Sequence, residues 1–464
     1  MQNNQKTTRL TNGGFKEVLT IALPLILSNS CHAINMFFDR LMLARYSDKA
    51  VSAAFTGGLT NFTVACIFIG TIGYTGTFVA QYNGARHGER IGSAVWQGIW
   101  MALAGGLLLA TGIWWAEPLF NCFDHDPAVT EQEINYFQIL SAGCFVFLLA
   151  GAVSCFWTGR GKTITVMLVS AVITMFNLPL NYLFIFGKFG FPELGTAGAA
   201  WGTILSELLG LIIYFVMFLS KSADKRYFTR KIKPDFELLK RMIRFGFPSG
   251  VHLALDLIAF NTFSLLLGGY GVAVHEASGI TFGINNIAFC PVIGIGMTAS
   301  VLVGQSIGAE NIPLARKSLR SCVILVTAYS ILMILLFSVF QSLVLSPFIR
   351  PGDTAQIPAL EISSYMLYFI SGYLLFDGFS IVFSNALRGA GDTKFPMWAI
   401  TCVGIFGFAL PCVILYSAGF PWWSLWIVFE CEILLLCIIF TLRYLGGKWT
   451  KMRVIELSAA EETE

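Results

Sequence analysis

The second half of this chain repeats the first half at a nearly constant spacing of 224 positions. The spacing takes Pro24 to Pro248. It also takes Gly70 to Gly294. In an apolar chain, a repeat of this length predicts two similar bundles of membrane helices. Membrane proteins built in this way commonly hold a substrate site between the repeats and move one repeat against the other.

Composition indicates a membrane protein. The 464 residues are 56% hydrophobic and only 12% charged, whereas about 25% of the residues of soluble domains are charged. A membrane span needs about 20 apolar residues, and the apolar stretches between charged or Gly/Pro-rich breaks predict twelve spans. We therefore expect an all-α polytopic membrane protein with twelve transmembrane helices in two parallel six-helix repeats. The net charge of +3 is small, and no nucleic-acid partner is expected.

Charged loops predict the orientation and the domain boundaries. Most Lys and Arg residues lie on the side of both termini, which the positive-inside rule places in the cytoplasm. We expect a multi-pass protein of the inner (plasma) membrane, in contact with its lipids. The predicted parts are an amino-terminal bundle over 1–220, a cytoplasmic linker over 221–240, a carboxy-terminal bundle over 241–450 and an acidic tail over 451–464.

No motif of the chain predicts a cofactor. The eleven cysteines lie mainly in apolar stretches and lack the spacing of a metal site. The GRGKT stretch at 159–163 has Phe156 where a phosphate-binding loop needs its first glycine. We therefore expect neither an ATPase nor a resident metal.

A few ionisable side chains lie inside the predicted spans. Such groups cost a few kcal/mol in lipid and commonly face a cavity and carry function. We expect Asp256 and Asp377 to have no basic partner within reach. Such carboxylates bind a cation, bind a proton or stay neutral as structural hydrogen-bond donors. The remaining candidates, each with a plain structural role as its alternative, are Asp39, Glu207, Glu430 and His32.

Two asparagines predict a second polar site. Asn177 and Asn181 are four residues apart, and therefore share one helix face. Together with Asp39 they supply oxygen ligands of the kind that alkali cations bind. The alternatives are a helix–helix hydrogen bond for the asparagines and an ion pair between Asp39 and Arg40.

Four motifs together resemble the MATE (multidrug and toxic compound extrusion) transporters over nearly the full chain. They are Pro24 with Asp39, the GxxxxxxxxxGQxxGA run at 294–309, the NxxxNYxFxFG run at 177–187 and LRGAGDTKFP at 387–396. The resemblance implies a V-shaped pair of six-helix bundles that exports organic cations in exchange for Na⁺ or H⁺. It also implies that Thr203 matches a site threonine of the amino-terminal bundle.

Within this family the chain is more similar to the NorM-type branch. That branch carries acidic residues in spans seven and ten, matched here by Asp256 and Asp377. The resemblance therefore implies that these two residues, with Asp39, couple transport to Na⁺ or H⁺. The branch often has Glu where this chain has Asp256, so the coupling ion stays open. The second bacterial branch has Asp where this chain has Asn181.

Three functions remain as hypotheses. The leading one is a monomeric secondary antiporter for small organic cations. A lipid-linked precursor flippase of the same superfamily is an alternative, although such proteins commonly have a basic cavity and this chain has almost no Lys or Arg within its spans. An intramembrane enzyme is disfavoured, because no cluster of His, Asp and Arg occurs near a membrane face.

Overall fold

The computed structural model describes residues 13–122, 126–349 and 356–456. Among these residues, twelve helices are long and apolar enough to cross a membrane, which confirms the predicted all-α fold with twelve spans. In chain order the helices of the first repeat and the linker are α1 (Phe15–Tyr46), α2 (Asp48–Gly73), α3 (Thr75–Gly84), α4 (Gly88–Ala110), α5 (Gly112–Phe120), α6 (Pro127–Thr158), α7 (Thr163–Phe186), α8 (Thr196–Phe218) and α9 (Lys221–Tyr227).

The second repeat follows the same order. Its helices are α10 (Phe236–Gly268), α11 (Val272–Gly308), α12 (Ile312–Val339), α13 (Gln341–Leu345), the 3₁₀ turn η1 (Ser346–Phe348), α14 (Ile357–Ala390), α15 (Lys394–Cys402), η3 (Val403–Ala409), α16 (Leu410–Ser417), α17 (Trp423–Leu445) and the 3₁₀ turn η4 (Lys448–Lys451). η3 is a π-helical segment between α15 and α16, and no sequence pattern predicts it.

Local sequence signals set several helix ends. Asp126 caps α6 by accepting a hydrogen bond from the backbone N–H of Ala128, and Pro127 occupies the first helical position, where its missing N–H costs nothing. α7 ends at Gly187 and α14 ends at Gly391, both with positive φ. Glycine adopts this left-handed conformation without a steric penalty.

Internal contacts divide the chain into two compact units. The amino-terminal unit consists of Leu27–Asn261 and Thr393–Thr401, and the carboxy-terminal unit consists of Met1–Ile26, Thr262–Asp392 and Cys402–Glu464. Each unit thus takes part of α1 and part of α10. The bundle boundaries expected from the sequence stay a prediction.

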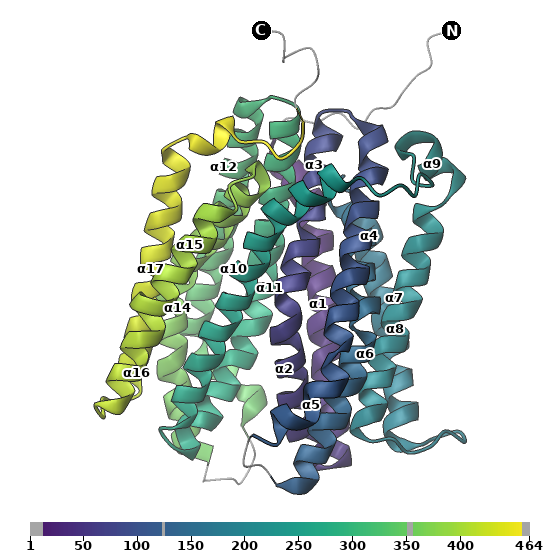
Figure 1. Ribbon diagram of the computed structural model, residues 1–464. Coiled ribbons are helices and arrows are strands. Elements are labelled where there is room, and N and C mark those ends of the chain that lie inside the picture. Colours follow the sequence, from purple (N-terminus) through teal and green to yellow (C-terminus); the bar gives the residue numbers. More distant parts are fainter. Residues whose placement is uncertain (1–12, 123–125, 350–355, 457–464) are drawn as a thin grey trace, which may run out of the picture. The chain divides into compact units, whose positions relative to one another are not determined.

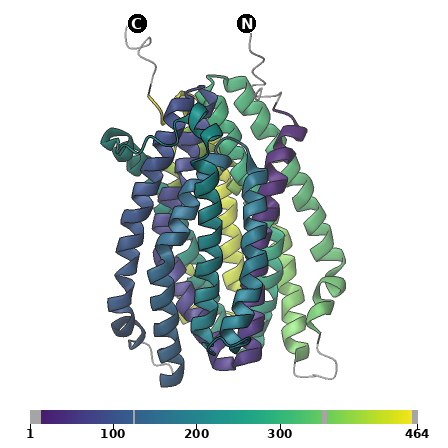
Figure 2. The ribbon, with the colours of Figure 1, turned by 90° about the vertical axis from the view of Figure 1, so that its right-hand side faces the viewer.

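One helix is central to each unit. In the amino-terminal unit α6 packs against α2, α4, α7 and α8, and these helices run side by side in Figures 1 and 2. In the carboxy-terminal unit α14 packs against α11, α12 and α17. The segment 159–163, directly after α6, matches the segment 389–393, which spans the end of α14, in the internal repeat. The same structural position is therefore used twice.

A close helix crossing is repeated as well. In the amino-terminal unit a Cβ added to Gly70 would lie 2.7 Å from the Cα atom of Gly250. In the carboxy-terminal unit a Cβ added to Gly294 would lie 2.5 Å from Cγ1 of Ile26. The 224-residue spacing takes Gly70 to Gly294 and Ile26 to Gly250. Small residues thus allow the same close helix approach in both units.

The segment after α9 is fastened to α4. Trp96 donates its indole N–H to the carbonyl of Thr229 at 2.7 Å. Gln97 donates to the carbonyl of Lys233 at 3.2 Å and accepts from the backbone N–H of Asp235 at 3.2 Å. Arg90 adds an ion pair to Asp235 at 3.1 Å. Figure 1 shows α9 beside the end of α4.

Candidate functional site

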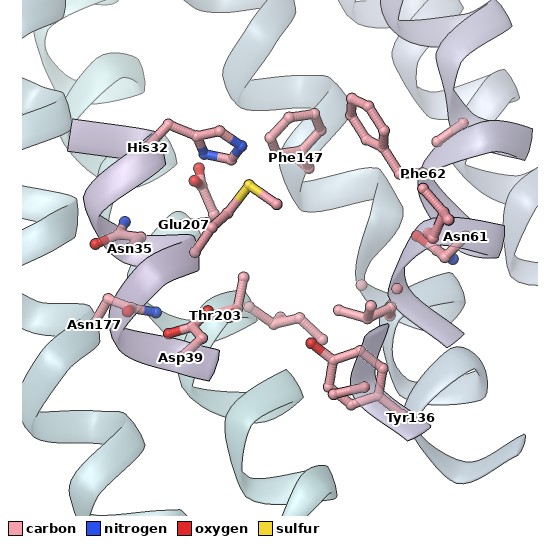
Figure 3. Close-up of a pocket in the computed structure, with 18 of the residues that line it drawn as sticks. His32, Asn35, Asp39, Asn61, Phe62, Tyr136, Phe147, Asn177, Thr203 and Glu207 are labelled. Carbon is pink, nitrogen blue, oxygen red and sulfur yellow. The ribbon is translucent and has the colours of Figure 1, made fainter. Parts of the chain in front are cut away.

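The candidate site is a cavity of about 290 Å³ in the amino-terminal unit, lined by α1, α2, α6, α7 and α8. Its volume lies near the lower end for ligand pockets. Figure 3 shows polar side chains from several of these helices around the space. The polar side chains of its lining include His32, Asn35, Asp39, Arg40, Asn61, Tyr136, Asn177, Thr203, Ser206 and Glu207.

A hydrogen-bonded network joins Asp39 to α7. The amide of Asn181 donates to Oδ1 of Asp39, and it also donates to Oδ1 of Asn177 at 3.1 Å. Asn177 in turn donates to Oγ of Ser206 at 3.4 Å. Both asparagines are buried. The structure thus brings together the three residues of the predicted second polar site, and their role in ion binding stays a prediction.

The network depends on a glycine of α8. A Cβ at Gly202 would overlap with Oδ1 of Asn181, so only glycine lets α8 approach α7 this closely. Thr203, the next residue, lines the cavity and donates its hydroxyl hydrogen bond to the backbone of Ala199 at 3.0 Å. Its side-chain oxygen therefore retains lone pairs for a bound group.

Arg40 is not the ion-pair partner of Asp39. Its guanidinium lies 5.2 Å from the ring centroid of Phe55 on α2. Within the described ranges the structure shows no ion pair between Arg40 and Asp39. The charge of Arg40 still acts on the Asp39 carboxylate, and the alternative that Asp39 serves to pair with Arg40 stays a hypothesis.

His32 and Glu207 lie toward the other end of the same cavity. Figure 3 shows the carboxylate of Glu207 pointing toward the imidazole of His32, with Phe147 nearby and with Asp39 and Thr203 lower in the view. Five residues proposed from the sequence, His32, Asp39, Asn177, Thr203 and Glu207, thus line one cavity.

The expectation that Asp256 lacks a basic neighbour is wrong. Nδ1 of His252, one helical turn earlier on α10, lies 3.4 Å from Oδ2 of Asp256. The His252 side chain is only 7% exposed, whereas that of Asp256 is 48% exposed. The i, i+4 spacing is visible in the sequence, and it places both side chains on one helix face.

The remaining acidic candidates lie in the carboxy-terminal unit. Asp377 is on α14 one turn after Tyr373, whose hydroxyl donates to Oδ1 of Asn285 at 3.3 Å. Asp377 and Glu430 both act electrostatically on Tyr373. The predicted joint site of Asp256 and Asp377 involves residues of different units and stays a prediction.

Sequence reasoning missed part of the cavity lining. Asn35 lies between His32 and Asp39 at helical spacing, so the face of α1 that carries them could have been found. Asn61 and Ser206 had no such signal, because each reaches the cavity through helix packing. Asn61 donates to Ser141 at 2.9 Å and thereby links α2 to α6.

The described residues contain no group of three or more His, Cys, Asp or Glu side chains that could hold a metal ion. The Asp39 network instead offers one carboxylate with amide and hydroxyl oxygens. Such a donor set suits a proton or an alkali cation better than a transition metal, which prefers nitrogen or sulfur ligands.

Twelve apolar helices, an internal repeat and an acidic cavity within the helices define a membrane transporter. Residues 24–183 and 248–413 match the MatE family model, and the chain belongs to this family. It is thus a multi-pass membrane transporter and not an enzyme.

Relatives matched over most of their length carry multidrug-resistance names. The chain is 27% identical over 458 residues to the "Probable multidrug resistance protein NorM" of Thermotoga maritima, with 96% of each chain covered. It is 25% identical to the "Multidrug resistance protein PmpM" of Pseudomonas aeruginosa, with 88% of this chain and 84% of the relative covered.

Solved structures share the fold. A MOP superfamily transporter from Pyrococcus furiosus matches with a TM-score of 0.86 at 18% identity, over 97% of this chain and 100% of that chain. The outward-facing structure of a multidrug resistance MATE family transporter of the MOP superfamily matches with a TM-score of 0.84 at 18% identity, over 94% and 96% of the two chains.

Proposed function

We propose that this chain is a multidrug efflux antiporter. It exports organic cations from the cytoplasm across the inner membrane in exchange for Na⁺ or H⁺, as a monomer with both termini in the cytoplasm. The names of its relatives support multidrug efflux. The observation that carries the cationic substrate is the cavity with Asp39 and Glu207 in its lining and no lysine.

The charge of the lining supports cations over anions. Arg40, the basic side chain of the lining, has its guanidinium over the ring of Phe55. An anion would bring a third negative charge beside the two carboxylates, and its desolvation would be uncompensated. A cation would receive both an ionic partner and the faces of aromatic rings.

Coupling requires an ion that changes the balance between transport states. An ion that binds one conformation better shifts the population toward it. Asp39, Asp256 and Asp377 are the carboxylates proposed for this role. His252 lies 3.4 Å from Asp256, so a protonated imidazole there would compete with a metal cation for that carboxylate.

Transport into inverted membrane vesicles tests the proposal. A proton gradient, a Na⁺ gradient, both or neither is imposed across the vesicle membrane. The cargo is a fluorescent organic cation or an anionic dye of similar size. We expect gradient-driven uptake of the cation and little uptake of the anion. Preference for the anion would move the assignment to the flippase hypothesis, and absence of any gradient dependence would reject antiport.

A further inference from the structure

The cavity has one carboxylate toward each end, Asp39 and Glu207, and the two carboxylates differ in their hydrogen bonding. Asp39 accepts a hydrogen bond from Asn181, which also binds Asn177. Glu207 lines the cavity and makes no hydrogen bond or ion pair with any residue in the described ranges. A carboxylate withdrawn from water without a partner is costly. A cationic ligand would remove that cost.

The ends are separated along the helix axes. Thr203 and Glu207 are four residues apart on α8, and His32 and Asp39 are seven apart on α1. At 1.5 Å per residue, these spacings correspond to roughly 6 and 10 Å. Figure 3 shows Glu207 with His32 at one level and Thr203 with Asp39 at another. One small ion therefore cannot contact both carboxylates at once.

The surroundings of Glu207 fit an organic ammonium group. Phe62, Phe147 and Met36 line the cavity, and aromatic faces attract organic cations. The Glu207 carboxylate can accept the N–H bonds of a protonated amine.

We propose that Glu207, with the ring of Phe147, forms a subsite for the ammonium group of a protonated aromatic amine, separate from the ion site at Asp39. This inference rests on the proposed function and deepens it, since it assigns substrate recognition and ion coupling to different carboxylates. The subsite also implies a preference: protonated amines with N–H donors bind more tightly than neutral molecules with the same aromatic part.

Binding to the purified full-length protein tests the subsite. The probes are dansylcadaverine, which carries a primary ammonium group at pH 7, and its neutral N-acetyl derivative. We expect the wild-type protein to prefer the amine about tenfold or more, the value of a charge-assisted hydrogen bond. Glu207→Gln should bring this preference close to one. The matched control is Glu361→Gln, which changes an exposed acid of α14 in the other unit and should leave the preference unchanged.

Two further variants separate this inference from the proposed function. Asp39→Asn should keep the amine preference while gradient-driven export is lost. If Glu207→Gln does not fold, Glu207→Asp should give a folded protein with an intermediate preference. Full preference in the Glu207 variants, or its loss in Asp39→Asn, would overturn the subsite. Failure of the wild-type protein to export any cation down an imposed gradient would instead overturn antiport, whatever the binding results.

Discussion

The amide of Asn181 gives the sharpest test of the Asp39 network. Asn181→Ala deletes the hydrogen bond to the Asp39 carboxylate and the 3.1 Å bond to Asn177, at a position that is 0% exposed. A hydrogen bond to a charged group contributes about 1.5–3 kcal/mol and a neutral one about 1 kcal/mol. The bond to Asp39 alone therefore changes the ion-binding equilibrium by about 10- to 150-fold, since 1.4 kcal/mol is tenfold.

Export from proteoliposomes and thermal unfolding in detergent measure these effects. We expect Asn181→Ala to abolish gradient-driven export at ordinary ion concentrations and to lower the melting temperature. Ser206→Ala is the matched control, because it removes the 3.4 Å bond from Asn177 and the 2.9 Å bond to the carbonyl of Thr203 but leaves the bond to Asp39 in place; it should cost about 1–2 kcal/mol and keep the ion response. Wild-type export together with wild-type ion response in Asn181→Ala would refute the idea that this network sets ion affinity.

Three other substitutions address the remaining acids. Asp377→Asn should abolish gradient-driven export while leaving membrane insertion intact, and normal export rates in that variant would remove Asp377 from the coupling site. A protonated His252 places positive charge 3.4 Å from Asp256, so His252→Gln should relieve the loss of Na⁺-driven export at acidic pH; an unaltered pH profile would contradict this. The pKa of Asp126 is lowered by its hydrogen bond from Lys49, so the contact stabilises the fold above the ordinary carboxyl pKa and is lost as pH falls through the lowered value. Both side chains are about half exposed, so the contact contributes little to stability. Lys49→Met should therefore leave export at pH 7 unchanged. Melting curves of the variant and the wild-type protein at pH 7 and pH 3 check the contribution to stability.

The sequence predicts helices well because each span depends on local composition and length. The twelve spans and the shared face of Asn177 and Asn181 follow from hydropathy and from the 3.6-residue period. The joining of α7 to Asp39 was also within reach, since both segments carry polar groups where lipid would exclude them. In these cases the free-energy cost of placing a polar side chain in the membrane makes its position in an apolar segment informative.

Other features depend on packing between distant segments and leave little trace in the sequence. Glu207 lies near His32 only because α8 and α1 line the same cavity. The π-helical segment Val403–Ala409 follows an ordinary apolar pattern. The His252–Asp256 pair is different, since its i, i+4 spacing is visible in the sequence.

The attachment of the linker to α4 has a consequence for biogenesis. Synthesis completes the Arg90–Gln97 face of α4 well before Thr229–Asp235 leaves the ribosome, and domains generally form in this order. The segment can therefore dock on a finished surface, and α10 then begins at Phe236, directly after the last anchored residue. The second repeat enters the membrane from a fixed starting point instead of a freely moving tether, which reduces the chain entropy that its insertion must overcome.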